Sequence, residues 1–192
     1  MMFTDKWAFC HIPKTGGMNF KTRLKEKGEM SFPDNKYPYT MFLHQPISYW
    51  IEIGTIPEGY QWITIVRNPY SRLVSWYYFL KQRGKIPSFE QFVKTRFLLT
   101  HKGGGHWKEF IENGGTWRMH WEQYRWIKGE QNCKVFHMEN LKELEDYTGY
   151  KFMDTQHNST RHGPWEDHYT KETRDIVYER YREDFENFGY RR

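Results

Sequence analysis

The stretch that most constrains the fold of this chain lies near its beginning, where an apolar run meets a glycine turn. Residues Trp7–Ile12 have the length and residue types of a buried strand. The run stops at Pro13, the residues Lys14–Gly17 follow, and from Met18 onward apolar side chains recur at helical spacing. The sequence therefore predicts a strand, a turn and a helix in immediate succession.

A strand that enters a helix through a glycine turn directs backbone N–H groups and the positive end of the helix towards one point. Phosphate groups bind at such points, and Lys14 adds a full positive charge there. An ordinary turn that uses Gly16 and Gly17 only for their conformational freedom has almost the same pattern. On these residues alone, phosphate binding is only modestly favoured.

Length and composition bound the remaining possibilities. A chain of 192 residues can bury one core, so we expect a single domain over residues 1–192. Aromatic residues make up 19% of the chain, and we expect the tryptophan- and glycine-rich residues 84–129 to form loops and helices around a cleft, although packing of these loops onto the body explains them almost equally well. The net charge of +5 favours anionic ligands, although ordinary surface solubility explains it equally well.

The cysteine content and hydropathy predict where the chain resides. Its two cysteines are Cys10, inside a predicted buried strand, and Cys133, which argues against a disulfide framework. No apolar stretch approaches twenty residues, and the first residues lack the apolar core of a signal peptide. We expect a soluble cytoplasmic protein, with no membrane association and no nucleic-acid partner.

Strands and helices alternate along the predicted chain. Further strands are expected at residues 39–43, 61–66 and 134–138. Further helices are expected at residues 47–53, 69–81 and 88–98. Another helix should begin at a capping box formed by Asn140 and Glu143, and a final helix should run from Thr170 through Phe188. This alternation predicts an α/β domain with a mostly parallel sheet. Ligands of such sheets bind at the carboxyl ends of the strands, and Lys14, His44, Arg67 and Glu139 all follow predicted strands.

The second informative stretch is Ile65–Tyr78, which reads IVRNPYSRLVSWYY. Arg67 comes directly after a predicted strand and immediately before a helix N-terminus, and Ser75 lies further along that helix. The planar donor fork of arginine suits phosphate, and a serine hydroxyl can complete the pocket. A structural ion pair for Arg67 and close helix packing for Ser75 explain this stretch equally well.

Taken together, the HIPKTGG stretch at His11–Gly17 and the Ile65–Tyr78 stretch resemble the sulfotransferase family that uses 3′-phosphoadenosine-5′-phosphosulfate (PAPS). The carbohydrate branch, which includes the heparan and chondroitin sulfotransferases, is the most similar. The resemblance continues through Val135–Leu141 and ends within Asn158–Tyr190. It implies a P-loop-like three-layer α/β fold, in which helices flank a central and mostly parallel sheet.

The resemblance also implies which residues bind PAPS. The first motif is the family's 5′-phosphosulfate loop and the second is its 3′-phosphate motif, and a later loop closes over the nucleotide. The implied contacts are Lys14, Thr15, Gly16, Gly17, Met18 and Asn19 in the first, Arg67 and Ser75 in the second, and Ser159 and Thr160 in the loop. Where this chain has Met18-Asn19, the family usually has Thr-Ser, so the contact of Met18 must come from its backbone N–H or be lost.

Sulfuryl transfer needs a base, because a neutral alcohol is a poor nucleophile. His44 is our candidate, since it resembles in position the catalytic histidine of the uronyl 2-O-sulfotransferases and has a near-neutral intrinsic pKa. A packing histidine remains the alternative, with Glu52 as a reserve base. Lys14 would stabilise the charge on the departing oxygen in a direct in-line transfer to a carbohydrate hydroxyl, without a metal ion.

Two other functions share parts of this pattern. A P-loop kinase or hydrolase also has a strand, a glycine turn and a helix, but its lysine follows the glycines, whereas Lys14 precedes them. A non-catalytic module that binds a nucleotide or polyanion is the second alternative, favoured by Met18 and Asn19.

Overall fold

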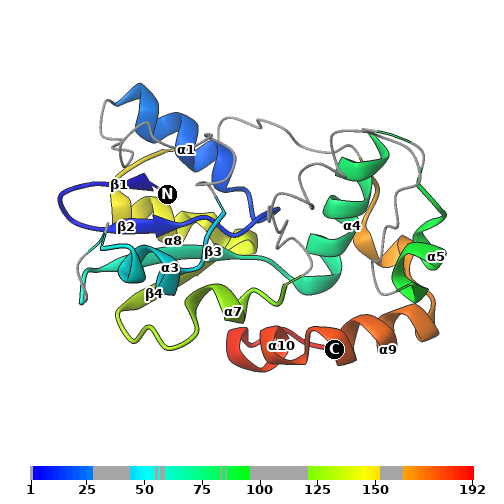
Figure 1. The fold of residues 1–192 in the computed structure, drawn as a ribbon. Helices are drawn as coiled ribbons and strands as arrows, with labels where there is room; N and C mark the ends of the chain where they lie inside the picture. The colour runs from blue at the N-terminus through cyan, green and yellow to red at the C-terminus, as the bar shows by residue number, and fades with distance from the viewer. Residues whose placement is uncertain are drawn as a thin grey trace. The chain divides into compact units, whose positions relative to one another are not determined.

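A computed structural model describes residues 2–27, 44–54, 56, 59–82, 84, 86–95, 121–151 and 162–192 (Figure 1). The chain divides into two compact units, each described by itself. The first unit comprises Met1–Asn68 and Glu122–Ser159, and the second comprises Pro69–Trp121 and Thr160–Arg192.

The first unit is built on a four-stranded sheet with the order β1-β2-β3-β4. The strands are β1 (Met2–Phe3), β2 (Ala8–Cys10), β3 (Trp62–Val66) and β4 (Cys133–His137). Strand β1 runs antiparallel to β2, whereas β2, β3 and β4 are parallel, with Phe9 beside Ile63 and Ile63 beside Lys134. Every residue of β2 and β3 is buried, which explains why both read as short continuous apolar runs.

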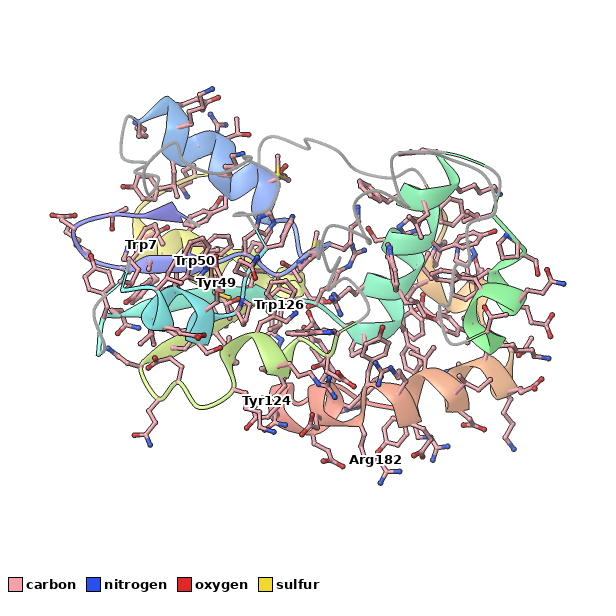
Figure 2. The ribbon with its side chains drawn as sticks, in the orientation of Figure 1. Trp7, Tyr49, Trp50, Tyr124, Trp126 and Arg182 are labelled. Atoms are coloured by element: carbon pink, nitrogen blue, oxygen red, sulfur yellow. The ribbon has the colours of Figure 1, made fainter. Side chains whose placement is uncertain are left out.

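Helices cover both faces of this sheet (Figure 1). They are α1 (Gly17–Glu26), α3 (Ile47–Glu52), α7 (Tyr124–Ile127) and α8 (Leu141–Thr148), and a 3-10 turn, η2 (Met138–Asn140), precedes α8. On one face, α1 and α8 pack through Trp7, Phe9, Phe20, Leu24, Ile63, Ile65, Phe136 and Leu144. On the other face, the Cys10 thiol lies 3.8 Å from the carbonyl oxygen of Trp126 in α7. Trp50 in α3 and Trp126 are both buried (Figure 2). The expected α/β class with its mostly parallel sheet is confirmed.

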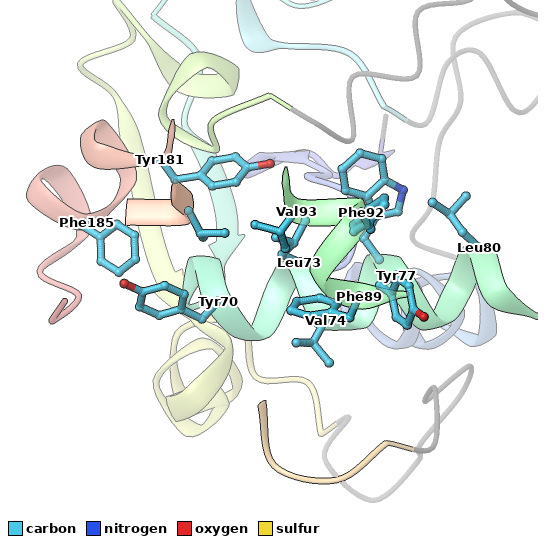
Figure 3. Packing of buried hydrophobic residues seen from close by; sticks show 12 residues of the cluster. Tyr70, Leu73, Val74, Tyr77, Leu80, Phe89, Phe92, Val93, Tyr181 and Phe185 are labelled. Atoms are coloured by element: carbon cyan, nitrogen blue, oxygen red, sulfur yellow. The ribbon is translucent and has the colours of Figure 1, made fainter. Parts of the chain in front are cut away.

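The second unit is helical in its described part. It contains α4 (Pro69–Lys81), α5 (Phe89–Lys94), the 3-10 turn η3 (Trp165–His168), α9 (Lys171–Arg180) and α10 (Arg182–Phe188). Aromatic rings fill much of its core (Figure 3), which includes Tyr70, Leu73, Val74, Trp76, Tyr77, Phe89, Phe92, Val177, Tyr181 and Phe185. As the composition predicts, aromatic side chains replace the scarce aliphatic ones.

Two local predictions are wrong. The expected final helix is two helices, because Tyr181 leaves helical geometry at φ −113° and ψ 26° between α9 and α10. Asn140 precedes α8 but makes no capping bond, since its amide donates to the Glu143 carboxylate at 2.6 Å instead. The capping box occurs at Thr170 and Thr173 at the start of α9. The strand expected at 39–43 lies outside the described residues.

Candidate functional site

The turn that follows β2 in the first unit has an unusual backbone. Lys14 has φ 69°, a left-handed conformation that is uncommon for a residue with a side chain, and Gly16 follows with φ 80°. The Thr15 hydroxyl donates to the carbonyl oxygen of Ile12 at 2.9 Å, which fixes the turn from inside. The chain then enters α1 at Gly17.

Space requires a glycine at position 17 of this turn, and backbone conformation favours one at position 16. A Cβ atom on Gly17 would lie 2.3 Å from Cδ2 of the His11 ring, which is shorter than any real contact. A Cβ atom on Gly16 would lie 3.3 Å from the terminal carbon of Met138, at a backbone angle that already disfavours side chains. The turn therefore packs directly on His11, which follows β2, and on Met138 from η2.

The start of α1 has the properties of an anion site. Gly16, its N-cap, offers no side-chain capping bond, and the first turn contains no acidic residue. The first N–H groups of a helix have no partner within the helix, and the helix dipole makes this end positive. The half-buried Lys14 adds a positive charge to the same turn. Such an end binds sulfate, phosphate or carboxylate groups.

His44 joins this turn through a backbone bond that fixes its tautomer. Its Nδ1 atom lies 3.0 Å from the carbonyl oxygen of His11. Since a carbonyl oxygen can only accept, Nδ1 carries the proton, and Nε2 of the neutral ring is the unprotonated nitrogen. The two imidazole rings also pack together, with centroids 4.5 Å apart. His44 thus has the protonation pattern that a general base needs.

His11 has a different electrostatic character. Its side chain is 3% exposed, and within the described residues its Nδ1 atom has no hydrogen-bond partner. Burial, reinforced by the neighbouring His44, holds the pKa of His11 well below its usual range. His11 is therefore neutral at pH 7, so its ring places no positive charge beside the ring of His44.

Arg67 lies at the end of β3 and contacts the same turn. Its Nη1 atom donates to the carbonyl oxygen of Lys14 at 3.3 Å. Its backbone is held by Gln123, whose Oε1 accepts from the Arg67 N–H at 2.9 Å and whose Nε2 donates to the Arg67 carbonyl at 2.8 Å. The next N–H, that of Asn68, donates to the Glu139 carboxylate at 2.8 Å. An arginine, not a metal-binding aspartate, thus follows β3.

Within the first unit, His44 bonds to the backbone of His11, and Arg67 bonds to that of Lys14. Met18 and Asn19 lie half-buried in the first turn of α1. Ser75 lies within α4 of the second unit and is 5% exposed. Glu52 is exposed at the end of α3. Ser159 and Thr160 lie outside the described residues.

Gln123 is a residue of this site that sequence reasoning missed. It is fully buried, and its amide is separated by 56 positions from the backbone that it binds. It stands within a tryptophan- and glycine-rich stretch that has no helical or strand periodicity. A lone glutamine next to Glu122 gives no signal for such a long-range contact.

The described residues contain neither a membrane-spanning helix nor a cluster of metal ligands. No helix in this part of the chain has both the length and the apolar character needed to cross a membrane. Within the same residues, no three histidine, cysteine, aspartate or glutamate side chains cluster closely enough to hold a metal ion.

Comparison with known proteins places the chain in a family. Among curated proteins, none matches this sequence. The family model described as the sulfotransferase family matches residues 3–191, which is nearly the whole chain. The match includes both strand-end stretches and agrees with the parallel sheet and with the glycine turn before α1. The chain therefore belongs to the sulfotransferase family.

Proposed function

We propose that this sulfotransferase uses PAPS as its donor and a carbohydrate hydroxyl as its acceptor, with His44 as the base. One observation carries the proposal: two candidate side chains are hydrogen-bonded to the backbone of the same short segment. His44 Nδ1 lies 3.0 Å from the His11 carbonyl oxygen, and Arg67 Nη1 lies 3.3 Å from that of Lys14. The candidate base and the candidate phosphate ligand are thus tied to one turn.

The donor side of the proposal rests on the chemistry of this turn. The uncapped start of α1 and the Lys14 ammonium group favour a sulfate or phosphate at the 5′ end of the nucleotide. The Thr15 side chain is buried and its hydroxyl donates to Ile12, so its contribution, like that of Gly16, Gly17 and Met18, comes from the backbone. Asn19 contributes its side-chain amide. By family resemblance, Arg67 and Ser75 hold the 3′-phosphate, and Ser159 and Thr160 close over the nucleotide.

In the reaction, His44 Nε2 takes the proton from the acceptor hydroxyl as its oxygen attacks sulfur. The new S–O bond forms while the S–O bond to the 5′-phosphate breaks, and the electron pair of that bond stays on the phosphate oxygen. The Lys14 ammonium group stabilises the negative charge that grows there. PAPS supplies the activated sulfuryl group. Transfer is direct and in line, so that the protein positions groups and balances charge without forming a covalent intermediate.

The carbohydrate acceptor rests on resemblance and composition. The sequence resembles the carbohydrate branch, and aromatic residues are 19% of the chain, which suits sugar binding. Residues 84–129 are the proposed cleft segment, and most of them lie outside the described residues.

Transfer of radiolabelled sulfate from PAPS to a panel of glycans tests the function. We expect transfer by the unaltered chain, and a loss of about 100-fold or more in kcat for His44→Ala and Lys14→Ala. The nucleotide product, adenosine 3′,5′-bisphosphate, should bind to His44→Ala as it does to the unaltered chain.

Lys128→Ala is the matched control for Lys14→Ala, because Lys128 is an exposed lysine of the first unit at the end of α7. Full transfer by His44→Ala would rule out its role as the base. Absence of transfer to every glycan, with nucleotide binding intact, would favour a non-catalytic module. Tighter binding of ATP with Mg²⁺ than of the bisphosphate would favour a kinase instead.

A further inference from the structure

The second unit contains a cavity that none of the residues discussed so far lines, apart from the core residue Tyr70. Its volume is about 320 Å³, and it lies beside the first turns of α9 and the last residue of the chain. Its lining residues are Tyr70, Tyr169, Lys171, Arg174, Asp175 and Arg192. Three of these six side chains are cationic and one is anionic, so the cavity has a net positive charge.

The carboxylate in the cavity is already paired. Asp175 Oδ1 lies 2.6 Å from Nη2 of Arg192. Within the described residues, neither Arg174 nor Lys171 has an ion-pair partner. Burial raises the pKa values of Tyr70 and, more strongly, of Tyr169, so both phenols stay neutral and supply no negative charge. Two positive charges therefore remain uncompensated at the cavity.

Arg174 is held in place by aromatic rings rather than by a carboxylate. Its guanidinium carbon lies 5.3 Å from the ring centroid of Tyr70 and 5.7 Å from that of Trp165. These two rings are stacked on each other at 5.0 Å with an interplanar angle of 11°. Tyr70 in turn packs against Phe185 (Figure 3), with ring centroids 5.0 Å apart. Cation–π contacts orient the guanidinium, and its planar fork of N–H donors suits an oxyanion.

A further bond makes this arrangement rigid. The Tyr169 hydroxyl donates to the carbonyl oxygen of Tyr70 at 3.0 Å, which ties the segment before α9 to the start of α4. The Tyr70 hydroxyl donates to the Arg174 carbonyl at 3.4 Å. Because the phenols are engaged with the backbone, the cationic groups provide the polar recognition in this cavity. Binding an anion here would not require these groups to reorganise first.

We propose that this cavity binds the sulfate or carboxylate group of an acidic saccharide, with Arg174 and Lys171 as its ligands. A guanidinium group and an ammonium group together match the oxygen atoms of either group. The cavity lies in the second unit and is a binding site in its own right. The choice of a saccharide, rather than another molecule with an oxyanion, rests on the carbohydrate acceptor proposed above. The expectation that the cavity binds an oxyanion rests only on its lining residues.

Isothermal titration of the full chain, without any nucleotide, tests this site. The probes are a sulfated uronic-acid oligosaccharide, its desulfated form that keeps the carboxylates, a neutral oligosaccharide of equal length, and inorganic sulfate. We expect both acidic oligosaccharides to bind and the neutral one not to bind. Arg174→Gln should weaken the binding of the acidic saccharides by about tenfold or more, and Lys171→Gln by several-fold.

Arg182→Gln is the matched control, because Arg182 is an exposed arginine of α10 that does not line the cavity (Figure 2). We expect it to change the affinity less than about twofold. Since Arg174 packs on two rings, the melting temperature of its variant is measured as well. Lys171 is exposed and tests the site even if that variant is unstable.

Equal weakening by Arg182→Gln would show diffuse charge attraction and overturn the proposal. So would full binding by both cavity variants, or inorganic sulfate that binds as tightly as the saccharides. Adding His44→Ala separates this site from the proposed reaction. That variant should bind the acidic saccharides at the cavity unchanged, even if the chain transfers no sulfate at all.

Discussion

The side chain of Gln123 pairs with the backbone of Arg67 as a neighbouring strand would. Its amide accepts from the Arg67 N–H at 2.9 Å and donates to the Arg67 carbonyl at 2.8 Å. Arg67 is the first residue beyond β3, where the ladder between strands has ended and backbone groups need other partners. A fully buried glutamine thus fixes the backbone from which the candidate phosphate ligand projects.

Replacing Gln123 with leucine should weaken the protein and the nucleotide site together. The variant leaves the N–H and C=O of Arg67 without their partner, which should lower the free energy of unfolding by about 2–4 kcal/mol. If Arg67 binds the 3′-phosphate, the affinity for adenosine 3′,5′-bisphosphate should fall about tenfold, whereas that for adenosine 5′-monophosphate should hardly change. Urea denaturation and calorimetry measure both. Equal losses for the two nucleotides would show that Gln123 has only a structural role.

The contact between Gly17 and His11 should be measurable as a coupling energy. Gly17→Ala places a Cβ atom 2.3 Å from the His11 ring, so we expect a loss of about 2–3 kcal/mol in stability. His11→Ala leaves a small cavity but removes the clash. The double variant should therefore be less destabilised than the sum of the two single variants by at least about 1 kcal/mol. Strict additivity in urea denaturation would contradict the packing described for this turn.

Stability should fall with acid partly because of His11. Its pKa is lowered by burial and by His44, so the folded chain leaves it neutral at a pH where the unfolded chain protonates it. The unfolded state then binds more protons below about pH 6.5, and the free energy of unfolding declines as the pH falls, by at most about 1.4 kcal/mol per pH unit from this group. His11→Gln should flatten that slope between pH 6.5 and 5.5 (about one unit below the ordinary histidine pKa). An unchanged slope in urea denaturation would contradict the lowered pKa.

Both thiols should resist labelling in the folded protein. Burial raises the pKa of Cys10 well above its usual range, and burial, followed by the charge of Glu130, raises that of Cys133 to about 12. Because the thiolate is the reactive form, we expect a disulfide reagent at pH 8 to react at least about 100-fold more slowly than with a free thiol. In urea both cysteines should react at once. Rapid labelling of Cys133 in the folded protein would show that its thiol is less buried than described.

The parts of the fold that were predictable are those specified by neighbouring residues. Strand β3 follows from five consecutive apolar or β-branched residues, and α4 follows from Pro69 at its first position. Ser88 caps α5 as expected, with its hydroxyl accepting from the Gln91 N–H. In each case the signal and the structure lie within a few residues of each other.

The features that the sequence analysis missed depend on contacts between distant residues. The spacing of Asn140 and Glu143 fits a capping box, but a direct bond between these two side chains competes with the cap. Tyr181 breaks the final helix although its neighbours keep helical spacing on both sides. For the site, the strand-end rule named Lys14, His44, Arg67 and Glu139, whereas the contacts of His11 and Gln123 required the three-dimensional structure.

At Lys14, the residue that would best stabilise the fold differs from the one that the proposed reaction needs. A side chain at φ 69° costs about 1 kcal/mol relative to relaxed geometry, and glycine would avoid that cost. Lys14→Gly should therefore raise the melting temperature while abolishing sulfuryl transfer. If Lys14 serves the transfer, the stability lost to its left-handed backbone is given up for catalysis, and glycine would be the better residue here only in a chain that transfers no sulfate.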